Sequence, residues 1–421
     1  MEEKRNLKWW MQLIVRFKKD RISFISFCFL LLMIGIGLFA DIIANEKPLY
    51  IKIDGQAYFP AFKSMLIGSN NNKVFSFKEY ESAESIILPL IPYSPYNQDI
   101  LNNKLKGPFD EQNISSNRWR HWLGTDDLGR DVLSGMIYGI RYALGIGVSS
   151  MLLALIIGLF MGTLSAFYGD DGFSLPLHRL LFITFSICAV VFMIFESRYF
   201  NWVDAINNSG FEIIYELLIL ICIVVLCKLI EKAFLVFSFS NKYMKHKVYL
   251  PLDIIINRSI EITVSIPVLF LIISLVAVFS SSIYLLIIII GLTQWTTMAR
   301  FLRAEVLKVK ELGYIESAHA LGFSDMRIIV KHILPNSITP VLIAVSFGIA
   351  STILIEASLS FLGIVPGDLI TWGVLLKGAK EFSAPWWIAV FPGMAIFFTV
   401  TIFNLIGEGI SDASNPKLNK A

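Results

Sequence analysis

Long runs of apolar residues recur along the chain, and they restrict what it can fold into. Eight such runs cover residues 22–44, 140–167, 177–196, 211–230, 252–280, 282–299, 338–362 and 386–406. A helix needs about 20 apolar residues to cross a bilayer, and in lipid a helix satisfies its own backbone donors and acceptors. The pattern therefore predicts an all-α integral membrane protein with about eight transmembrane helices.

The composition agrees with this class and disfavours others. Of the 421 residues, 55% are hydrophobic and only 16% are charged, which is low for a soluble protein. The formal net charge of +3 is too small to argue for a nucleic acid partner. Four cysteines lie within or at the edge of apolar runs, and we interpret them as small buried side chains rather than a disulfide or metal site. They are Cys28, Cys188, Cys222 and Cys227. We expect no metal and no cofactor.

Basic residues near the ends of the chain predict its orientation. Residues 1–21 are rich in lysine and arginine, so we expect the N-terminus in the cytoplasm and the first apolar run as an uncleaved anchor. Lys417 and Lys420 favour a cytoplasmic C-terminus. We expect four parts: the N-terminus and first helix over 1–46, an external subdomain over 47–138, a transmembrane domain over 139–411 and a tail over 412–421.

The external part is polar and rich in turns. Its segments Tyr50–Asp54 and Val74–Phe77 alternate like short strands, which predicts a small subdomain rather than a linker. Contact with an external partner and a passive elaboration both remain open for it.

A compact charged segment, HWLGTDDLGRD over residues 121–131, follows this subdomain. Its glycines permit turns, and its charged side chains can pair locally where the chain re-enters the membrane. The residues singled out are Gly124, Thr125, Asp126, Asp127, Gly129, Arg130 and Asp131. A metal site on His121 and the aspartates is the alternative, which Arg130 disfavours because its charge would repel a cation.

Residues 177–250 contain two apolar runs and then a basic loop. An even number of spans returns the chain to the same side of the membrane, so this hairpin leaves the topology of the remaining chain unchanged. We expect it to pack on the outside of the protein rather than to take part in transport, and its role stays open.

A polar stretch, Glu311–Pro340, separates two apolar runs. Tyr314, Ala318 and Leu321 recur at helical spacing and predict one stripe of a short helix. Gly322 suits the left-handed residue that ends a helix, and Ser324 or Asp325 suits the start of a second helix. We predict that this second helix stops before Pro335.

Polar residues within the apolar runs are the remaining candidates. Arg258 and Glu261 are spaced to pair on a helix, and Pro267 predicts a kink. Glu356 lies inside an apolar run, where a carboxylate must face protein or water. It either lines a translocation path or braces a contact with Ser358 or Ser360 of a neighbouring helix.

Motifs of nucleotide hydrolysis and of common hydrolases are missing from the sequence. It contains no G-x-x-x-x-G-K-[ST], no H-E-x-x-H and no G-x-S-x-G. We therefore predict that the chain is not an enzyme, and that any ATP chemistry comes from another chain.

Three segments resemble the permeases of ABC importers, in particular the C-type subunit of the peptide/nickel (oligopeptide/dipeptide) family. The stretch 316–335 is similar to the EAA loop of these permeases, with Ser317 in place of an alanine and His332 in place of an isoleucine. HWLGTDDLGRD and the string EASLSFLG from Glu356 are similar to further signatures of the family.

The resemblance implies a six-helix type I core, a coupling loop over 300–338 and a bacterial inner membrane location. The coupling residues it implies are Glu316, Ser317, Ala318, Gly322, Leu334 and Pro335. The partners it implies are two ATPase subunits, a sister permease, an external solute-binding protein and membrane lipid. Short peptides are the expected substrate, and the alternatives are nickel, another small solute, or a secondary carrier without an ATPase.

Overall fold

The computed structural model describes residues 9–53, 55–67, 84–102, 105–114, 116–198, 201, 210–237, 246–278, 282–365, 369–381 and 385–414. Within this part of the chain five helices are long and apolar enough to cross a membrane, and a bent helix pair gives up to six. These observations agree with an all-α membrane protein, but the described residues give fewer candidate spans than the eight predicted, because the helices formed by the apolar runs at 177–196 and 211–230 are not among them. The predicted strand at 74–77 lies outside the described residues.

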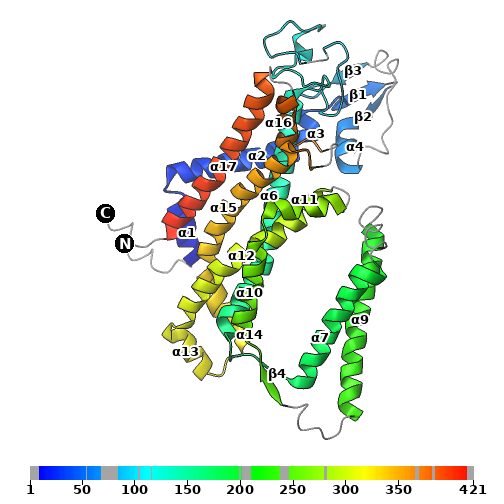
Figure 1. The fold of residues 1–421 in the computed structure, drawn as a ribbon. Helices are drawn as coiled ribbons and strands as arrows, with labels where there is room; N and C mark the ends of the chain where they lie inside the picture. The colour runs from blue at the N-terminus through cyan, green and yellow to red at the C-terminus, as the bar shows by residue number, and fades with distance from the viewer. Residues whose placement is uncertain are drawn as a thin grey trace. The chain divides into compact units, whose positions relative to one another are not determined.

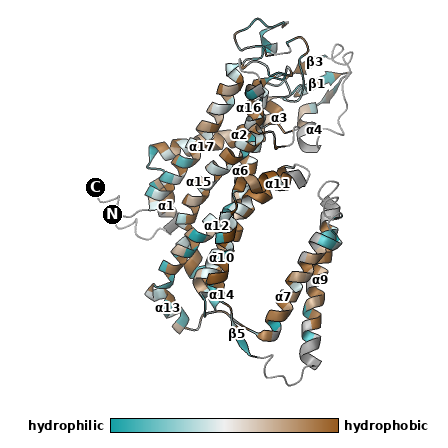
Figure 2. Cartoon of the chain, in the orientation of Figure 1, coloured by the Kyte–Doolittle hydropathy of each residue, from teal (hydrophilic) through white to brown (hydrophobic). Residues whose placement is uncertain are grey.

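The chain divides into two units, Met1–Phe160 with Thr263–Ala421, and Met161–Ile262. In the first, α15 (Leu334–Phe361) packs against α12 (Ile283–Lys310), α16 (Trp372–Glu381) and α17 (Trp386–Ser414). The helix α17 also contacts α1 (Trp9–Phe17) and α2 (Arg21–Leu38). Figure 1 shows α15 and α17 side by side, and Figure 2 shows the apolar residues along both.

Small residues let α6 (Val132–Tyr168) approach its neighbours closely. A Cβ atom placed on Gly147 would lie 3.2 Å from Ile353, and one on Gly158 would lie 2.4 Å from Met298. Glycines at helix contacts are a general feature of membrane proteins. The helix begins at Val132, earlier than the apolar run at 140, and at its start the Asp131 carboxylate accepts the backbone N–H of Ser134 at 2.7 Å.

The predicted bend at Pro267 is confirmed. One apolar run forms α10 (Leu252–Ser265) and α11 (Val268–Val278), and the pair is bent by 75° at the break. The proline has no backbone N–H to donate and cannot continue the hydrogen-bond pattern of α10.

A small sheet forms part of the segment between α2 and α6. Strand β1 (Tyr50–Ile53) pairs antiparallel with both β2 (Gln56–Tyr58) and β3 (Ser85–Ile87), in the order β2-β1-β3. In sequence, α3 (Ala40–Ile43) precedes this sheet, and α4 (Pro60–Ile67) lies between β2 and β3. The strand predicted at 50–54 is therefore confirmed over residues 50–53, and Asp54 lies outside the described residues. Arg141 binds Asp41 at 2.7 Å and joins α6 to α3.

The second unit contains the predicted hairpin. Strands β4 (Ser174–Pro176) and β5 (Lys247–Tyr249) pair antiparallel and lead into α7 (Leu177–Phe192) and out of α9 (Gly210–Phe237). A π-helical turn, Met193–Ser197, ends α7, and α7 packs against α9. Arg198 binds Glu216 through two hydrogen bonds of 2.8 and 2.7 Å. This bidentate pair joins the end of α7 to the start of α9.

Candidate functional site

The polar segment after α12 folds as a short helix with a defined end. Helix α13 spans Gly313–Ala320, and Gly322 has a φ of +75°, as predicted for a left-handed end residue. The backbone N–H of Phe323 donates to the carbonyl oxygen of Ala318 at 3.2 Å, and that of Gly322 donates to His319 at 2.9 Å. These two bonds form a Schellman motif, which satisfies the last carbonyl groups of the helix.

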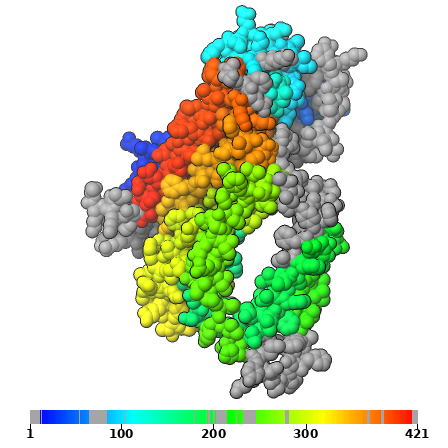
Figure 3. Space-filling view, in the orientation of Figure 1, coloured from blue at the N-terminus to red at the C-terminus, as the bar shows by residue number. Residues whose placement is uncertain are grey.

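The buried face of α13 differs from the predicted stripe. Ile315 and Ala318 are buried, whereas Tyr314 is 44% exposed and Leu321 is 72% exposed. Of the predicted stripe only Ala318 is buried, because α13 turns Ile315 rather than Tyr314 or Leu321 toward the protein. Glu316 and Ser317 are exposed, and the Ser317 hydroxyl donates to the carbonyl oxygen of Gly313 at 2.8 Å. The segment presents a mixed polar and apolar surface, shown in yellow in Figure 3.

Aromatic and cationic side chains hold the turn that follows. The Phe323 ring lies under the Arg327 guanidinium at 4.1 Å and stacks on His332 with ring centroids 6.1 Å apart. Helix α14 spans Asp325–Ile328, and Ser324 occupies its N-cap position as predicted, but the predicted side-chain hydrogen bond to the helix is not formed. The turn is therefore ordered mainly by the contacts of Phe323.

The prediction that this second helix stops before Pro335 is wrong. Residues 325–361 run as one helix, with a π-helical turn at Ile329–Ile333 directly before Leu334 and Pro335. The wider turn accommodates the proline ring, and the Asn336 side-chain amide donates to the carbonyl oxygen of His332 at 2.6 Å. The segment is thus joined rigidly to α15 and not through a loop.

The charged segment 121–131 forms a tight turn that precedes α6. Gly124 and Gly129 have φ values of +80° and +77°, and both are thus left-handed positions that favour glycine. Asp126 accepts hydrogen bonds from the backbone N–H of Arg130 at 2.8 Å and from its side-chain Nε at 2.7 Å. Thr125 is fully buried, and its hydroxyl accepts the Lys106 N–H at 2.9 Å. The predicted local charge pairing is confirmed for Asp126 and Arg130.

His121 is the buried centre of a second polar cluster. Its Nδ1 lies 2.9 Å from Asp131 and its Nε2 lies 3.2 Å from Asp99, and its ring stacks on Tyr93 at 4.1 Å. Burial favours the neutral imidazole, but hydrogen bonds and charge from Asp131 and Asp99 outweigh it and raise the pKa of His121. Sequence reasoning missed Asp99 and Tyr93, since neither lies in a motif.

Asp127 stands apart from these pairs. It makes no hydrogen bond or ion pair with a described residue, so its predicted local pairing is not observed. It lines a small pocket of 190 Å³ with Arg130 and Lys377. In the described part of the chain no group of three His, Cys, Asp or Glu side chains is arranged so that it could hold a metal ion.

Glu356 is buried in α15 at 1% exposure. The Ser360 hydroxyl donates to the Glu356 carboxyl group at 2.5 Å, and the Thr371 hydroxyl lies 3.1 Å from Ser360. The contact therefore links α15 to the residue before α16. It uses Ser360 of the same helix, whereas Ser358 points to the carbonyl oxygen of Leu354. The predicted serine from a neighbouring helix is wrong, and Thr371 takes its place.

Arg258 and Glu261 form the predicted ion pair, with a distance of 2.5 Å. Both side chains are largely exposed, at 72% and 60%. An exposed pair of this kind contributes little to stability.

The described structure is a set of long apolar helices with an ordered polar segment at the end of one of them. Residues 247–420 match the family of binding-protein-dependent transport system inner membrane components, and this part of the chain belongs to that family. The chain is an ABC importer permease, a multi-pass transporter component of the inner membrane that works with ATPase and substrate-binding partners.

Three relatives extend the similarity beyond the matched region. The dipeptide transport system permease protein DppC of Alkalihalophilus pseudofirmus is 27% identical over 79% of this chain and 81% of its own. The glutathione transport system permease protein GsiD of Pectobacterium atrosepticum is 27% identical over 78% and 80%. The inner membrane ABC transporter permease protein YejE of Escherichia coli is 27% identical over 96% of both chains.

Proposed function

We propose that this permease imports short peptides. The names of its relatives, which include dipeptide and glutathione permeases, support this substrate class. We assign a groove of 460 Å³ between α12 and α15 as one wall of the translocation path. Its lining is mostly apolar, with Gln294, Thr297 and Ser351 as hydrogen-bonding groups. Such a wall suits peptides of varied sequence, because a few polar groups serve the peptide backbone without selecting one charged side chain. A sister permease would close the groove.

The observation that carries the coupling role is the surface of α13 and the turn after it. Apolar side chains are exposed there beside Glu316, among them Tyr314, Leu321 and Met326, which is 70% exposed. Exposed apolar residues that gather at one place mark an interaction site. We assign this surface to a separate ATPase subunit that hydrolyses the ATP, with Gly322 fixing its shape and Leu334 and Pro335 transmitting the movement into α15.

The continuity of residues 325–361 suggests how the movement travels. A displacement of α13 by the ATPase acts on a helix that continues through the π-helical turn into α15, the helix that packs against α12, α16 and α17. Such a rigid element favours a change between two packed states over a gradual deformation. The ATPase would bias the equilibrium between an inward-open and an outward-open state.

The proposed topology places α13 in the cytoplasm together with both chain ends, and the turn at 121–131 outside. The small pocket beside Asp127 and Lys377 would then face the external solute-binding protein. This proposed arrangement keeps the four parts expected from the sequence. They are the N-terminus with the first helix (1–46), the external subdomain (47–138), the transmembrane domain (139–411, with the coupling loop at 300–338) and the tail (412–421). Glu356 braces α15 in this proposal and does not line the path, since its contacts are to Ser360 and Thr371 through buried hydroxyl groups.

The test is purification of the chain from its native membrane in mild detergent, followed by mass spectrometry of the proteins and ligands that accompany it. We expect two ATPase chains, a second permease and a binding protein that carries a peptide. A binding protein loaded with nickel or another small solute would overturn the peptide assignment alone. Recovery of the chain without any ATPase in several detergents would overturn the coupling role.

A further inference from the structure

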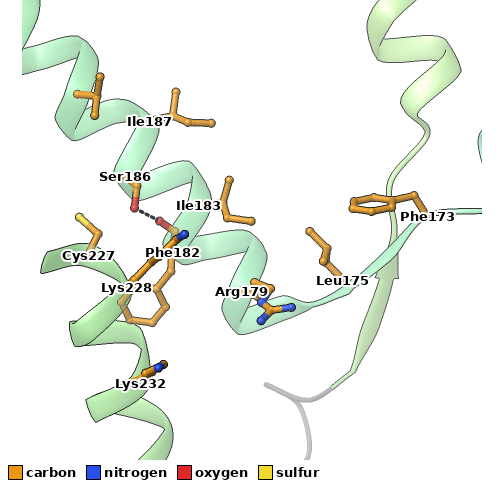
Figure 4. A pocket seen from close by; sticks show the side chains of 11 residues that line it. Phe173, Leu175, Arg179, Phe182, Ile183, Ser186, Ile187, Cys227, Lys228 and Lys232 are labelled. Atoms are coloured by element: carbon orange, nitrogen blue, oxygen red, sulfur yellow. Dashed lines mark hydrogen bonds between the residues drawn. The ribbon is translucent and has the colours of Figure 1, made fainter. Parts of the chain in front are cut away.

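The hairpin of α7 and α9 contains a pocket that the transport function does not explain. The pocket has a volume of 790 Å³ and lies between the two helices near the β4–β5 ribbon (Figure 4). Its wall on α7 is mostly apolar, with Phe182, Ile183 and Ile187 as the largest apolar side chains. Cys227 of α9 forms part of the opposite wall and is 6% exposed.

Positive charge gathers at one end of this pocket. Arg179 lies in the first turn of α7, and Lys228 and Lys232 lie four residues apart on α9, so that both lysines face the same side of the helix. Figure 4 shows all three side chains around the pocket. None of the residues that line it in the described part of the chain is acidic. The opposite end of the hairpin is joined by the ion pair of Arg198 and Glu216.

The pocket therefore combines a cationic end with an apolar wall within one unit of the protein. The cations suit a phosphate group, to which arginine and lysine donate charge-assisted hydrogen bonds. The apolar wall suits a hydrocarbon chain and offers nothing to a free phosphate. Basic pockets between transmembrane helices on the cytoplasmic side of a membrane suit anionic lipid head groups in general.

We propose that this pocket binds an anionic phospholipid, with the head group at Arg179, Lys228 and Lys232 and one acyl chain along Ile183 and Ile187. Binding would fasten the hairpin to the inner leaflet and fill the space between α7 and α9. The proposal rests on the topology of the proposed function, which puts the β4–β5 ribbon at the cytoplasmic face.

The test uses the full chain in mild detergent, with bound lipids counted by native mass spectrometry. Phosphatidylglycerol and phosphatidylcholine are added at equal concentration, and we expect phosphatidylglycerol to be retained preferentially. In the variant K228Q/K232Q, the retention of phosphatidylglycerol relative to phosphatidylcholine should fall by about fivefold for each lysine replaced. The matched control K18Q/K19Q removes two exposed lysines outside the hairpin and should bind as the parent chain does.

A second variant separates a lipid from a bare anion. Ile183→Trp fills the apolar wall and leaves the cations in place, so it should lower lipid retention as well. Glycerol 3-phosphate, the soluble head group, should compete poorly with the lipid. Equal retention of both lipids, equal loss in K18Q/K19Q, or full competition by glycerol 3-phosphate would each overturn the proposal.

The same preparations distinguish this proposal from the proposed function. Recovery of the ATPase chains with K228Q/K232Q would show that coupling is intact, whatever the lipid result. Unchanged lipid retention in a preparation that has lost the ATPases would leave the lipid site standing and refute the coupling role alone.

Discussion

The Nδ1 atom of His121 lies 2.9 Å from Oδ1 of Asp131, and the other oxygen of that carboxylate accepts the backbone N–H of Ser134 at 2.7 Å. One buried carboxylate therefore joins the turn at 121–131 to the first residues of α6. Asp99 reaches the other nitrogen of the imidazole, so the turn depends on a histidine held between two carboxylates.

This cluster predicts that the stability of the turn at 121–131 depends on pH. Because the pKa of His121 is raised in the folded protein, its protonated imidazole stabilises the fold. This stabilisation is complete below pH 6.5, the ordinary pKa of histidine, and is lost as the pH rises through the raised pKa. Burial would raise the pKa of Asp99, but hydrogen bonds from Asn102 and His121 outweigh this effect and lower it. The stability that the ionised Asp99 carboxylate contributes is complete above pH 3.8, the ordinary pKa, and is lost as the pH falls through the lowered pKa.

We therefore expect the turn to be most stable between about pH 4 and 6.5. The stability of the turn is measured as a function of pH by hydrogen exchange of the backbone amides of residues 121–134, with each rate corrected for the intrinsic exchange rate at that pH. His121→Gln should remove the loss of protection on the alkaline side, whereas His246→Gln, which changes an exposed histidine outside the cluster, should keep the parent profile. An unchanged profile in His121→Gln would contradict the assignment.

Gly322 and Gly313 should respond in opposite ways to alanine. Gly322→Ala puts a side chain at a φ of +75° and should cost about 1 kcal/mol. Gly313 begins α13 and has open space around it, so Gly313→Ala should be neutral or stabilising by up to about 1 kcal/mol. Two measurements compare the variants: the amount of ATPase that co-purifies with the chain, and the rate of ATP-dependent uptake. Normal uptake and ATPase recovery in Gly322→Ala would count against a shape requirement at this residue.

Trp372 requires glycine at position 139. Its indole donates to the carbonyl oxygen of Met136 at 3.0 Å, and a Cβ atom on Gly139 would lie 2.4 Å from its ring. Gly139→Ala should therefore destabilise the protein by about 1–3 kcal/mol. The matched control is Gly145→Ala in the same helix, where a Cβ atom meets nothing within 4 Å. Thermal unfolding in detergent compares them, and equal midpoints would refute the contact.

Glu356 should act through stability rather than through the path. Glu356→Gln keeps a side-chain oxygen that accepts the hydrogen bond from Ser360. Glu356→Ala removes this acceptor from the buried hydroxyl groups of Ser360 and Thr371, and should lower the free energy of unfolding by about 1–3 kcal/mol. Thermal unfolding and uptake are measured on both variants. If Glu356→Gln abolished uptake at unchanged stability, Glu356 would belong to the path.

Accessibility from the two sides of the membrane tests the topology. In a background without the four native cysteines, Lys247→Cys should react with a membrane-impermeant thiol reagent only in inverted vesicles. Gln56→Cys, which is also exposed, should react in intact cells. Both introduced residues belong to short strands, so their local settings are comparable. Labelling of both from the same side would break the proposed arrangement.

Local rules in the sequence were sufficient for several elements. The apolar runs identified the long helices, Gly322 the end of α13, and Pro267 the break between α10 and α11. Arg258 and Glu261 paired as their spacing indicated. In each case the cause lies within one helix or one turn: the length of a hydrophobic run, a backbone angle, or a missing donor.

Features that depend on distant parts of the chain were not predictable in the same way. The side of α13 that is buried depends on what packs against it, and this selects Ile315 over Tyr314. The continuation through Pro335 depends on a π-helical turn that neighbouring residues stabilise. Asp99 approaches His121 and Thr371 approaches Ser360 only after the chain has folded. Apolar length and backbone angles are properties of a segment, whereas burial and polar pairing are properties of two segments brought together.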